Sequence, residues 1–243
     1  MIFYRPGASL AKLVVQHPKA AAQYLINQLK EKYILIFLKE RKICKLTGAT
    51  SLEIKTYLDA LRSNVLLERH FREAINNYGY PIAGMTTPLR GPILYVLCRA
   101  VKPLYVVETG VASGVSSTFI LQALKDNHKG KLFSIDLPDP NVKTKTGWIT
   151  PKQLRSRWHL IVGKTQDKLV PILEDLKMID MFLHDSEHSY ENMIWEYRNS
   201  WLYLSPGGLL LSDDINSNNA FSDFSKEVKR IPVRFNLLGG IRK

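Results

Sequence analysis

A glycine-containing loop follows the short apolar run at residues 104–108, and its spacing is typical of a turn that binds a small ligand. The loop reads E-x-G-x-x-x-G from Glu108 to Gly114. Gly110 allows a sharp turn and a close approach of a ligand, while Gly114 and the Ser113 hydroxyl lie where the next helix begins. A carboxylate at Glu108 would repel a phosphate, so the loop differs from a dinucleotide fingerprint and favours a ligand with an ammonium group. The alternative is a strand-to-helix turn whose glycines serve packing alone.

The next apolar run, residues 131–136, ends in the acidic residue Asp136. A carboxylate in this place can accept hydrogen bonds from both hydroxyls of a ribose. An aspartate after a strand is also common for structural reasons. Asp136 therefore indicates a nucleoside only in combination with the glycine loop.

A second group of polar side chains lies at the ends of two later apolar runs: Asp185 and His188 at the end of one, Asp213 and Asp214 at the end of the other. Ends of neighbouring parallel strands lie together, so three carboxylates would repel one another unless a cation or protons intervene. Asp185, Asp213 and Asp214 are therefore candidate ligands of Mg²⁺. His188 is a candidate general base, because its ordinary pKa lies near neutrality, and it joins Asp185 and Asp213 as the catalytic candidates. The alternative is that Asp185 contacts a cofactor or a helix N-terminus, Asp213 caps the next segment, His188 makes a structural hydrogen bond and no metal binds.

The elements that must hold these residues alternate between apolar runs and amphipathic stretches. The runs lie at residues 104–108, 131–136, 159–163, 179–185 and 208–214, and the amphipathic stretches lie near residues 114–127, 165–177, 189–203 and 219–230. Strands that are nearly continuously apolar and alternate with helices predict a parallel sheet covered on both faces. Residues 231–242 leave no room for a helix and predict an antiparallel hairpin. We therefore expect an α/β fold with a Rossmann-like, doubly wound and mostly parallel sheet, closed by a C-terminal antiparallel hairpin.

The chain before this sheet is expected to be helical over residues 8–102. Apolar residues at spacings of three and four predict one helix; they are Ala22, Leu25, Ile26, Leu29, Tyr33 and Phe37. Thr50 or Ser51 can cap a following helix, with Glu53 close behind. Further helices are expected at residues 65–78 and 93–101.

Four segments together resemble class I S-adenosylmethionine-dependent methyltransferases, in particular the branch of small-molecule and sugar O-methyltransferases. The segments are ETGVASGVSSTFILQAL, FSIDLP, MIDMFLHDSEHSYENMIWEY and LSPGGLLLSDD. The resemblance covers residues 85–243 and leaves residues 1–84 outside it. We therefore expect a basic helical N-terminal segment at 1–84 and a methyltransferase domain at 85–243.

The resemblance assigns cofactor-binding roles to particular positions. The residues implied for the methionine part are Glu108, Gly110, Ser113 and the adjoining Gly114, with Asp136 for the ribose hydroxyls, Thr165 beside the adenine, and Asp185 as a further cofactor contact. The turn after Gly163 departs from many relatives, which have an acidic residue where this chain has Lys164.

The function that the resemblance implies is methyl transfer from S-adenosylmethionine to a hydroxyl of a small molecule or sugar. In some similar O-methyltransferases a metal held by such aspartates binds the hydroxyl and lowers its pKa. The expected cofactors are therefore S-adenosylmethionine and, in the metal-assisted form, Mg²⁺.

The charge of the chain supports two alternative functions. The chain has 243 residues, of which 45 % are apolar and 23 % charged, which is ordinary for a globular protein and excludes a disordered or fibrous one. Its net charge is +12, and residues 1–50 hold nine Lys/Arg against two Asp/Glu. This basic segment would suit an RNA methyltransferase or a non-catalytic module that binds a membrane surface. The sequence Ser-Asp-Asp-Ile at 212–215 opposes methylation of a base amino group, because it differs from the N/D-P-P-Y/F type motif.

The cysteines and the lengths of the apolar runs bear on the cellular location of the protein. Cys44 and Cys98 do not make a disulfide framework and are expected to be reduced thiols. No secretory signal or apolar run of about 20 residues is visible. We expect a cytoplasmic protein, with peripheral attachment to a membrane or a homo-oligomer through the N-terminal helices as further options.

Overall fold

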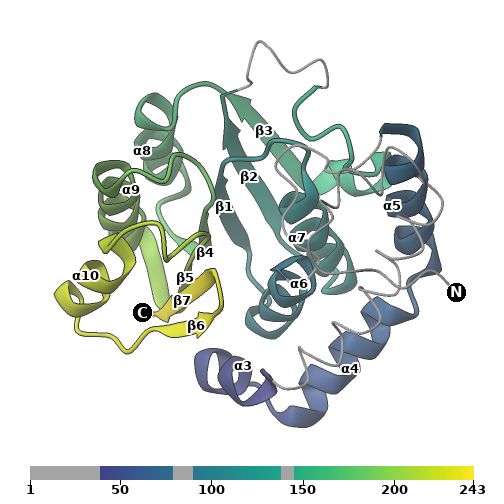
Figure 1. Cartoon of the computed structure of the whole chain (residues 1–243), viewed down its shortest axis with the longest axis horizontal. Coiled ribbons are helices and arrows are strands. Elements are labelled where there is room, and N and C mark those ends of the chain that lie inside the picture. Colours follow the sequence, from purple (N-terminus) through teal and green to yellow (C-terminus); the bar gives the residue numbers. More distant parts are fainter. Residues whose placement is uncertain (1–38, 79–89, 138–144) are drawn as a thin grey trace, which may run out of the picture.

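The computed structural model describes residues 39–78, 90–137 and 145–243. Its centre is a seven-stranded sheet with the strand order β3-β2-β1-β4-β5-β7-β6 (Figure 1). The strands are β1 (Tyr105–Thr109), β2 (Lys131–Asp136), β3 (Trp158–Val162), β4 (Ile179–His184), β5 (Leu204–Ser212), β6 (Val233–Phe235) and β7 (Leu238–Arg242). The first five strands pair in parallel, as the alternation of apolar runs and helices predicted.

The sheet closes with the predicted antiparallel hairpin. Strand β7 pairs antiparallel with both β5 and β6, and Phe235 lies opposite Leu238. Only Asn236 and Leu237 separate β6 from β7, and so short a connection permits an antiparallel turn but no crossover. The fold prediction is therefore confirmed.

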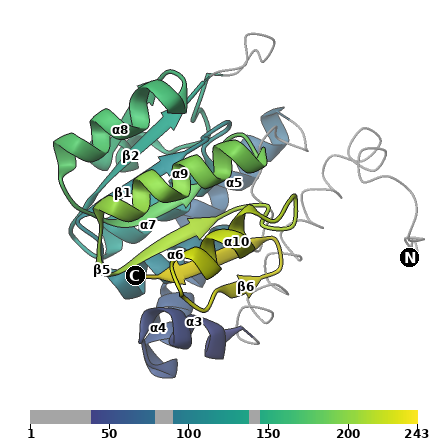
Figure 2. The same ribbon diagram turned by 90° about the vertical axis from the view of Figure 1, so that its left-hand side faces the viewer.

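Helices cover both faces of the sheet, as Figures 1 and 2 show. They are α3 (Glu40–Thr47), α4 (Ser51–Arg62), α5 (Val65–Tyr78), α6 (Arg90–Val101), α7 (Val115–Asp126), α8 (Thr165–Leu176), α9 (Tyr190–Tyr203) and α10 (Ala220–Glu227), with a short 3₁₀-helix, η1, at Lys152–Arg157. Helices α8, α9 and α10 lie on one face, and α6 and α7 lie on the other, with α3, α4 and α5 outside them (Figure 1).

The described part of the N-terminal helical segment shares a hydrophobic core with the sheet. Ile43 of α3 and Leu58 of α4 are buried in the same cluster as residues of α6, α7 and β5. Phe71 of α5 stacks on Phe119 of α7, with ring centroids 5.4 Å apart. The predicted cap of α4 is present, because Thr50 forms a reciprocal capping box with Glu53. The predicted apolar stripe at 22–37 and the boundary at residues 84 and 85 lie outside the described residues, so both remain predictions.

Two element boundaries differ from those expected. Helix α6 begins at Arg90, because Pro92 is tolerated in a first turn, where its missing N–H has no helical partner. Strand β5 begins at Leu204, before the expected 208, and its pairing with β4 is interrupted by a bulge at 205–208. Gly207, at φ +83°, provides the left-handed backbone that this bulge requires.

Both cysteines lie in the part of the chain that the structure describes. Cys44 is half-buried, Cys98 is buried, and both are free thiols as expected. Within residues 39–78, 90–137 and 145–243, no helix is both long and apolar enough to cross a membrane.

Candidate active site

A cavity of about 560 Å³ lies at the carboxyl ends of β1, β2, β3 and β4. Its size is within the range of small-molecule and cofactor sites, roughly 300–1,000 Å³. Its walls come from four loops and the start of two helices; the lining residues are Gly110, Val111, Ala112, Ile135, Asp136, Leu137, Lys164, Thr165, Gln166, Asp185, Ser186, Glu187 and Asn192. Among the residues expected to bind a cofactor, Gly110, Asp136, Thr165 and Asp185 therefore line one cavity.

Gly110 brings the loop after β1 against the loop after β4. Its φ is +82°, and a Cβ atom in its place would overlap the backbone carbonyl of Asp185. Its N–H donates to the carbonyl of Ile135 at 2.9 Å, which ties the same turn to the end of β2. The sequence prediction of a tight glycine turn with a close approach is confirmed, and the approaching group is the protein's own backbone.

Asp136 is held at the cavity wall by two hydrogen bonds. The N–H of Val111 donates to Oδ1 at 3.0 Å, and the hydroxyl of Thr146 donates to Oδ2 at 2.8 Å. Each carboxylate oxygen has a second lone pair, so the group can still accept hydrogen bonds from a ligand. The carboxylate of Asp136 is thus held in a fixed orientation at the cavity wall, where the sequence predicted a hydrogen-bond acceptor.

Glu108 lies beneath the glycine loop and is fully buried. Its carboxylate accepts hydrogen bonds from Ser116 and Ser117 of α7, at 2.5 and 2.6 Å, and from Ser134 of β2, at 2.7 Å. Burial raises the pKa of Glu108, while these three hydroxyls act in the opposite direction. Glu108 does not line the cavity. Its hydrogen bonds join α7 to β2.

Ser113 and Gly114 are also outside the cavity lining. Ser113 is buried, and its hydroxyl has no hydrogen-bond partner among the described residues. Gly114 packs against Gly147 and Thr150, which leaves no room for a side chain. Contacts from Glu108, Ser113 or Gly114 to a ligand remain predictions.

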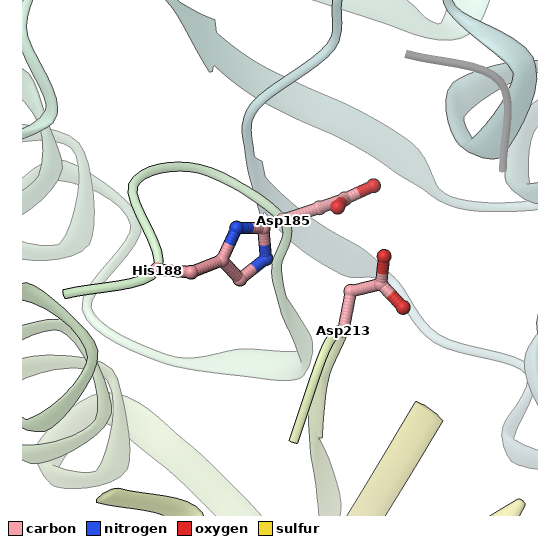
Figure 3. A group of neighbouring side chains, drawn as sticks. All are labelled: Asp185, His188 and Asp213. Atoms are coloured by element: carbon pink, nitrogen blue, oxygen red, sulfur yellow. The ribbon is translucent and has the colours of Figure 1, made fainter. Parts of the chain in front are cut away.

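A second group of side chains adjoins the cavity through Asp185. Figure 3 shows Asp185, His188 and Asp213 converging from the loops after β4 and β5, and their ligand atoms all lie within 4.8 Å of one another. Among the residues that the structure describes, His188 Nε2 and Asp213 Oδ1 are buried without a hydrogen-bond partner. Two carboxylates and an imidazole with free lone pairs fit a divalent cation that accepts oxygen and nitrogen ligands.

Arg90 is a member of this group that the sequence analysis missed. Its guanidinium donates through Nη1 to Asp213 Oδ2 and through Nη2 to Asp214 Oδ1, the latter at 3.0 Å. The repulsion expected among the carboxylates is thus reduced by an arginine from α6. Asp214, expected as a metal ligand, lies outside the three-residue group and pairs with Arg90, while His188 is in the group.

Burial shifts the pKa values of two members of the group. The pKa of Asp185 is raised well above its ordinary range, first by burial and then by the negative charge of Glu108. The pKa of His188 is lowered, mainly by burial. A neutral imidazole at neutral pH can act as a base or as a metal ligand.

Replacing Asp185 with asparagine will stabilise the ligand-free protein at neutral pH. Because folding raises the pKa of Asp185, its ionised form opposes folding, and stability is lost as the pH rises through the folded-state pKa. We expect the free energy of unfolding to increase by about 0.5–2 kcal/mol at neutral pH, and to be unchanged in acid, where the carboxyl is protonated in both states. Urea unfolding at the two pH values measures this, with the exposed Asp167→Asn as the matched control. A loss of stability at neutral pH would contradict the prediction.

Glu196 is the second residue that the sequence analysis missed. It is fully buried on α9 and accepts from Thr109 Oγ1 at 2.5 Å, His184 Nδ1 at 2.7 Å, Ser186 Oγ at 2.6 Å and Asn192 Nδ2 at 3.2 Å. Its spacing from Met193, Tyr197 and Ser200 places it on the buried face of α9, which is a signal that the sequence did contain. The network holds the loop after β4 against α9, and Ser186 and Asn192 of this network line the cavity.

Comparison with known proteins finds a family model that matches part of this chain. Residues 107–215 match the model of a family described as "Methyltransferase domain". This part of the chain is therefore similar to methyltransferase domains. The matched segment runs from β1 past the end of β5, so it includes the glycine loop, Asp136 and the group at Asp185, His188 and Asp213.

Curated proteins that are similar to part of this chain are named putative O-methyltransferases. A "Putative O-methyltransferase" of Mycobacterium sp. (strain JLS) is 34% identical over 102 residues, which are 40% of this chain and 46% of the relative. A protein of the same name from Mycolicibacterium smegmatis is 34% identical over 113 residues, or 45% of this chain and 51% of the relative. The chain spans about half the length of the curated relatives it matches.

Solved structures of methyltransferases share the fold of this chain at low sequence identity. The O-methyltransferase from Bacillus cereus in complex with SAH has a TM-score of 0.55 and 15% identity, covering 78% of this chain and 100% of the other. The O-methyltransferase TomG from Streptomyces achromogenes, in complex with SAM, has a TM-score of 0.55 and 15% identity, covering 74% and 91%. The SAH-bound methyltransferase PaMTH1 from Podospora anserina has a TM-score of 0.56 and 16% identity, covering 73% and 87%.

Proposed function

We propose that this protein transfers a methyl group from S-adenosylmethionine to a hydroxyl of a small molecule or sugar. The observation that carries the proposal is a cavity with Gly110 and Asp136 in its wall. It adjoins, through Asp185, the group with His188 and Asp213. A methyl donor in the cavity would then lie beside side chains that can orient and deprotonate an acceptor. The names of the curated relatives and the complexes of the structural neighbours support the same class of reaction.

The cavity offers a contact for each part of the cofactor. Asp136 would accept hydrogen bonds from the ribose hydroxyls. Thr165 and Lys164, at the start of α8, would lie beside the adenine, and the turn at Gly110 with Asp185 would hold the methionine part. Glu108 supports the loop from below, since its hydrogen bonds join α7 to β2.

The chemistry at the acceptor end would be a direct displacement. The acceptor oxygen forms a bond to the methyl carbon as the bond from that carbon to sulfur breaks, and the cofactor leaves as S-adenosylhomocysteine. His188, with a lowered pKa and an unpartnered Nε2, would take the hydroxyl proton. Alignment of the oxygen, methyl carbon and sulfur is the main requirement of such a step, and the walls of a preformed cavity favour it.

Metal-assisted transfer is the alternative form of the proposal. Mg²⁺ or a related ion held by Asp185, His188 and Asp213 would lower the pKa of the acceptor hydroxyl, and His188, with its Nε2 lone pair on the ion, would then not be the proton acceptor. The unpartnered oxygen of Asp213 and nitrogen of His188 are consistent with such a cation.

The alternative functions depend on the basic N-terminal segment. An RNA methyltransferase, a membrane-surface module and a homo-oligomer through the N-terminal helices all remain predictions, because residues 1–38 lie outside the described residues. The cytoplasmic location likewise remains a prediction.

The cofactor proposal is tested by calorimetric titration with S-adenosylhomocysteine. We expect the wild-type protein to bind it and Asp136→Ala to bind about 10- to 100-fold more weakly, since hydrogen bonds to a charged group contribute about 1.5–3 kcal/mol. Asp136→Asn separates the loss of charge from the loss of the internal bonds to Val111 and Thr146. The exposed Asp167→Ala, outside the cavity lining, should bind as the wild type does. Absence of binding by the wild-type protein would overturn the proposed function.

A further inference from the structure

Arg90 lies at the boundary between the N-terminal helices and the acidic ends of the sheet. It is the first residue of α6, and its side chain is only 12% exposed. Its two guanidinium nitrogens donate to Asp213 and Asp214, which both follow β5. The charge of an arginine cannot be removed by deprotonation in a protein, so Asp213 has a permanent positive neighbour.

Asp213 also belongs to the group of potential cation ligands. The residue is 4% exposed, and its Oδ1 is buried and unpartnered among the described residues. Figure 3 shows one oxygen of its carboxylate on the side of the Asp185 carboxylate, and the neighbouring His188 has an Nε2 that is also buried and unpartnered among the described residues. One oxygen of Asp213 therefore accepts from a guanidinium, and the other is available to a second cation.

The guanidinium of Arg90 and a metal ion bound to the same buried carboxylate of Asp213 would repel each other. A divalent ion at Asp213 Oδ1 would lie close to the Arg90 guanidinium, and charges in a partly buried group are screened less than charges in water. Removal of the guanidinium would abolish this repulsion and leave Asp213 and Asp214 in need of another cation. The arginine and the ion should thus influence each other strongly.

We propose that the positive charge of Arg90 takes the place of a metal ion at Asp213 and Asp214. By pairing with these carboxylates, Arg90 keeps the affinity of the Asp185–His188–Asp213 group for divalent metal ions low. The protein then keeps its acceptor-side carboxylates ordered without a metal. The catalytic meaning of this arrangement rests on the proposed methyl transfer, whereas the competition between the two cations is measured without cofactor or acceptor.

The experiment is a calorimetric titration of Mn²⁺ into the full chain, because Mn²⁺ accepts both carboxylate and imidazole ligands. The pH is kept well above the range in which exposed carboxyl groups titrate. We expect weak binding by the wild type, and binding at least about tenfold tighter by Arg90→Met and by Arg90→Gln, which lack the charge. Arg90→Lys keeps the charge and should bind Mn²⁺ about as weakly as the wild type.

Two controls test whether the gain in Mn²⁺ affinity depends on Asp213 and whether each variant is folded. Adding Asp213→Asn to Arg90→Met should abolish the gain in affinity, and thermal unfolding of each variant verifies that it is folded. Binding of Mn²⁺ by Arg90→Met and Arg90→Gln no tighter than by the wild type overturns the proposal, as does a gain that survives Asp213→Asn. The wild-type titration is decisive even if the variants do not fold, because a dissociation constant below about 1 μM contradicts a low affinity. A failure of S-adenosylhomocysteine binding would overturn the proposed function but would leave the Mn²⁺ result in force.

Discussion

Replacement of Glu196 with alanine will lower the free energy of unfolding by about 3–5 kcal/mol, the cost expected when one partner of a buried charged network is removed. The carboxylate is fully buried and accepts from four side chains, among them the ring of His184 and the hydroxyl of Thr109. All of these donors would lose a partner in a region from which water is excluded. Urea unfolding followed by circular dichroism measures the change.

The same substitution will weaken the binding of a ligand in the cavity. Ser186 and Asn192 each donate to Glu196 Oε1 and also line the cavity, so loss of the carboxylate removes their common support. We expect S-adenosylhomocysteine to bind at least about tenfold more weakly, equivalent to about 1.4 kcal/mol.

Two further variants identify the cause. Glu191→Ala removes an exposed glutamate from the same helix, and its effect should stay within about 0.5 kcal/mol. Glu196→Gln keeps the shape but presents an amide group to some of the donors, so its loss of stability should be intermediate. A loss of less than about 1 kcal/mol for Glu196→Ala would show that the network contributes far less than a typical buried one.

Substitution of Gly110 by alanine will be damaging for two independent reasons. The φ of +82° is unfavourable for a residue with a side chain, at a cost of about 1–2 kcal/mol. The added methyl group would also overlap the backbone of Asp185 and Ser186, and overpacking of this kind typically costs about 1–3 kcal/mol. If the two costs add, the free energy of unfolding falls by about 2–5 kcal/mol.

Gly207 provides a matched control for this substitution. Its φ of +83° is almost the same, but the nearest atoms to an added methyl group are those of the Arg242 side chain, 3.5 Å away. Gly207→Ala therefore measures the backbone cost alone, and the difference between the two variants measures the overlap with the loop after β4. Because Gly110 lines the cavity and Gly207 does not, only Gly110→Ala should lose S-adenosylhomocysteine binding. Equal losses of stability and of binding in both variants would refute the argument.

Much of the fold follows from patterns within short stretches of the chain. Residues 131–136 and 179–185 are mostly apolar and lie between amphipathic stretches, and they form β2 and β4 of a parallel sheet. Gly110 marks a turn because few other residues adopt its backbone conformation. Since parallel strands present their carboxyl ends at one edge, the positions of Asp136 and Asp185 beside one cavity could be predicted before any distance was known.

The pairing of charges, in contrast, depends on segments that are far apart in the chain. Repulsion among Asp185, Asp213 and Asp214 predicted that a cation must be near, but Arg90 lies 123 residues before Asp213. No local pattern connects these residues, because a guanidinium pairs with whichever carboxylate the packing of α6 brings within reach.

The same reason explains the other differences at the site. Glu108 lies near the end of β1, where a ligand contact was expected, yet its carboxylate is directed to hydroxyls of α7 and β2. His188, in place of Asp214, completes the group with Asp185 and Asp213, because folding brings its ring within reach of both carboxylates, while Asp214 pairs with Arg90. Residue types and strand ends can be identified from local periodicity, whereas the partner of each buried charge is decided by distances and burial that exist only in the packed protein.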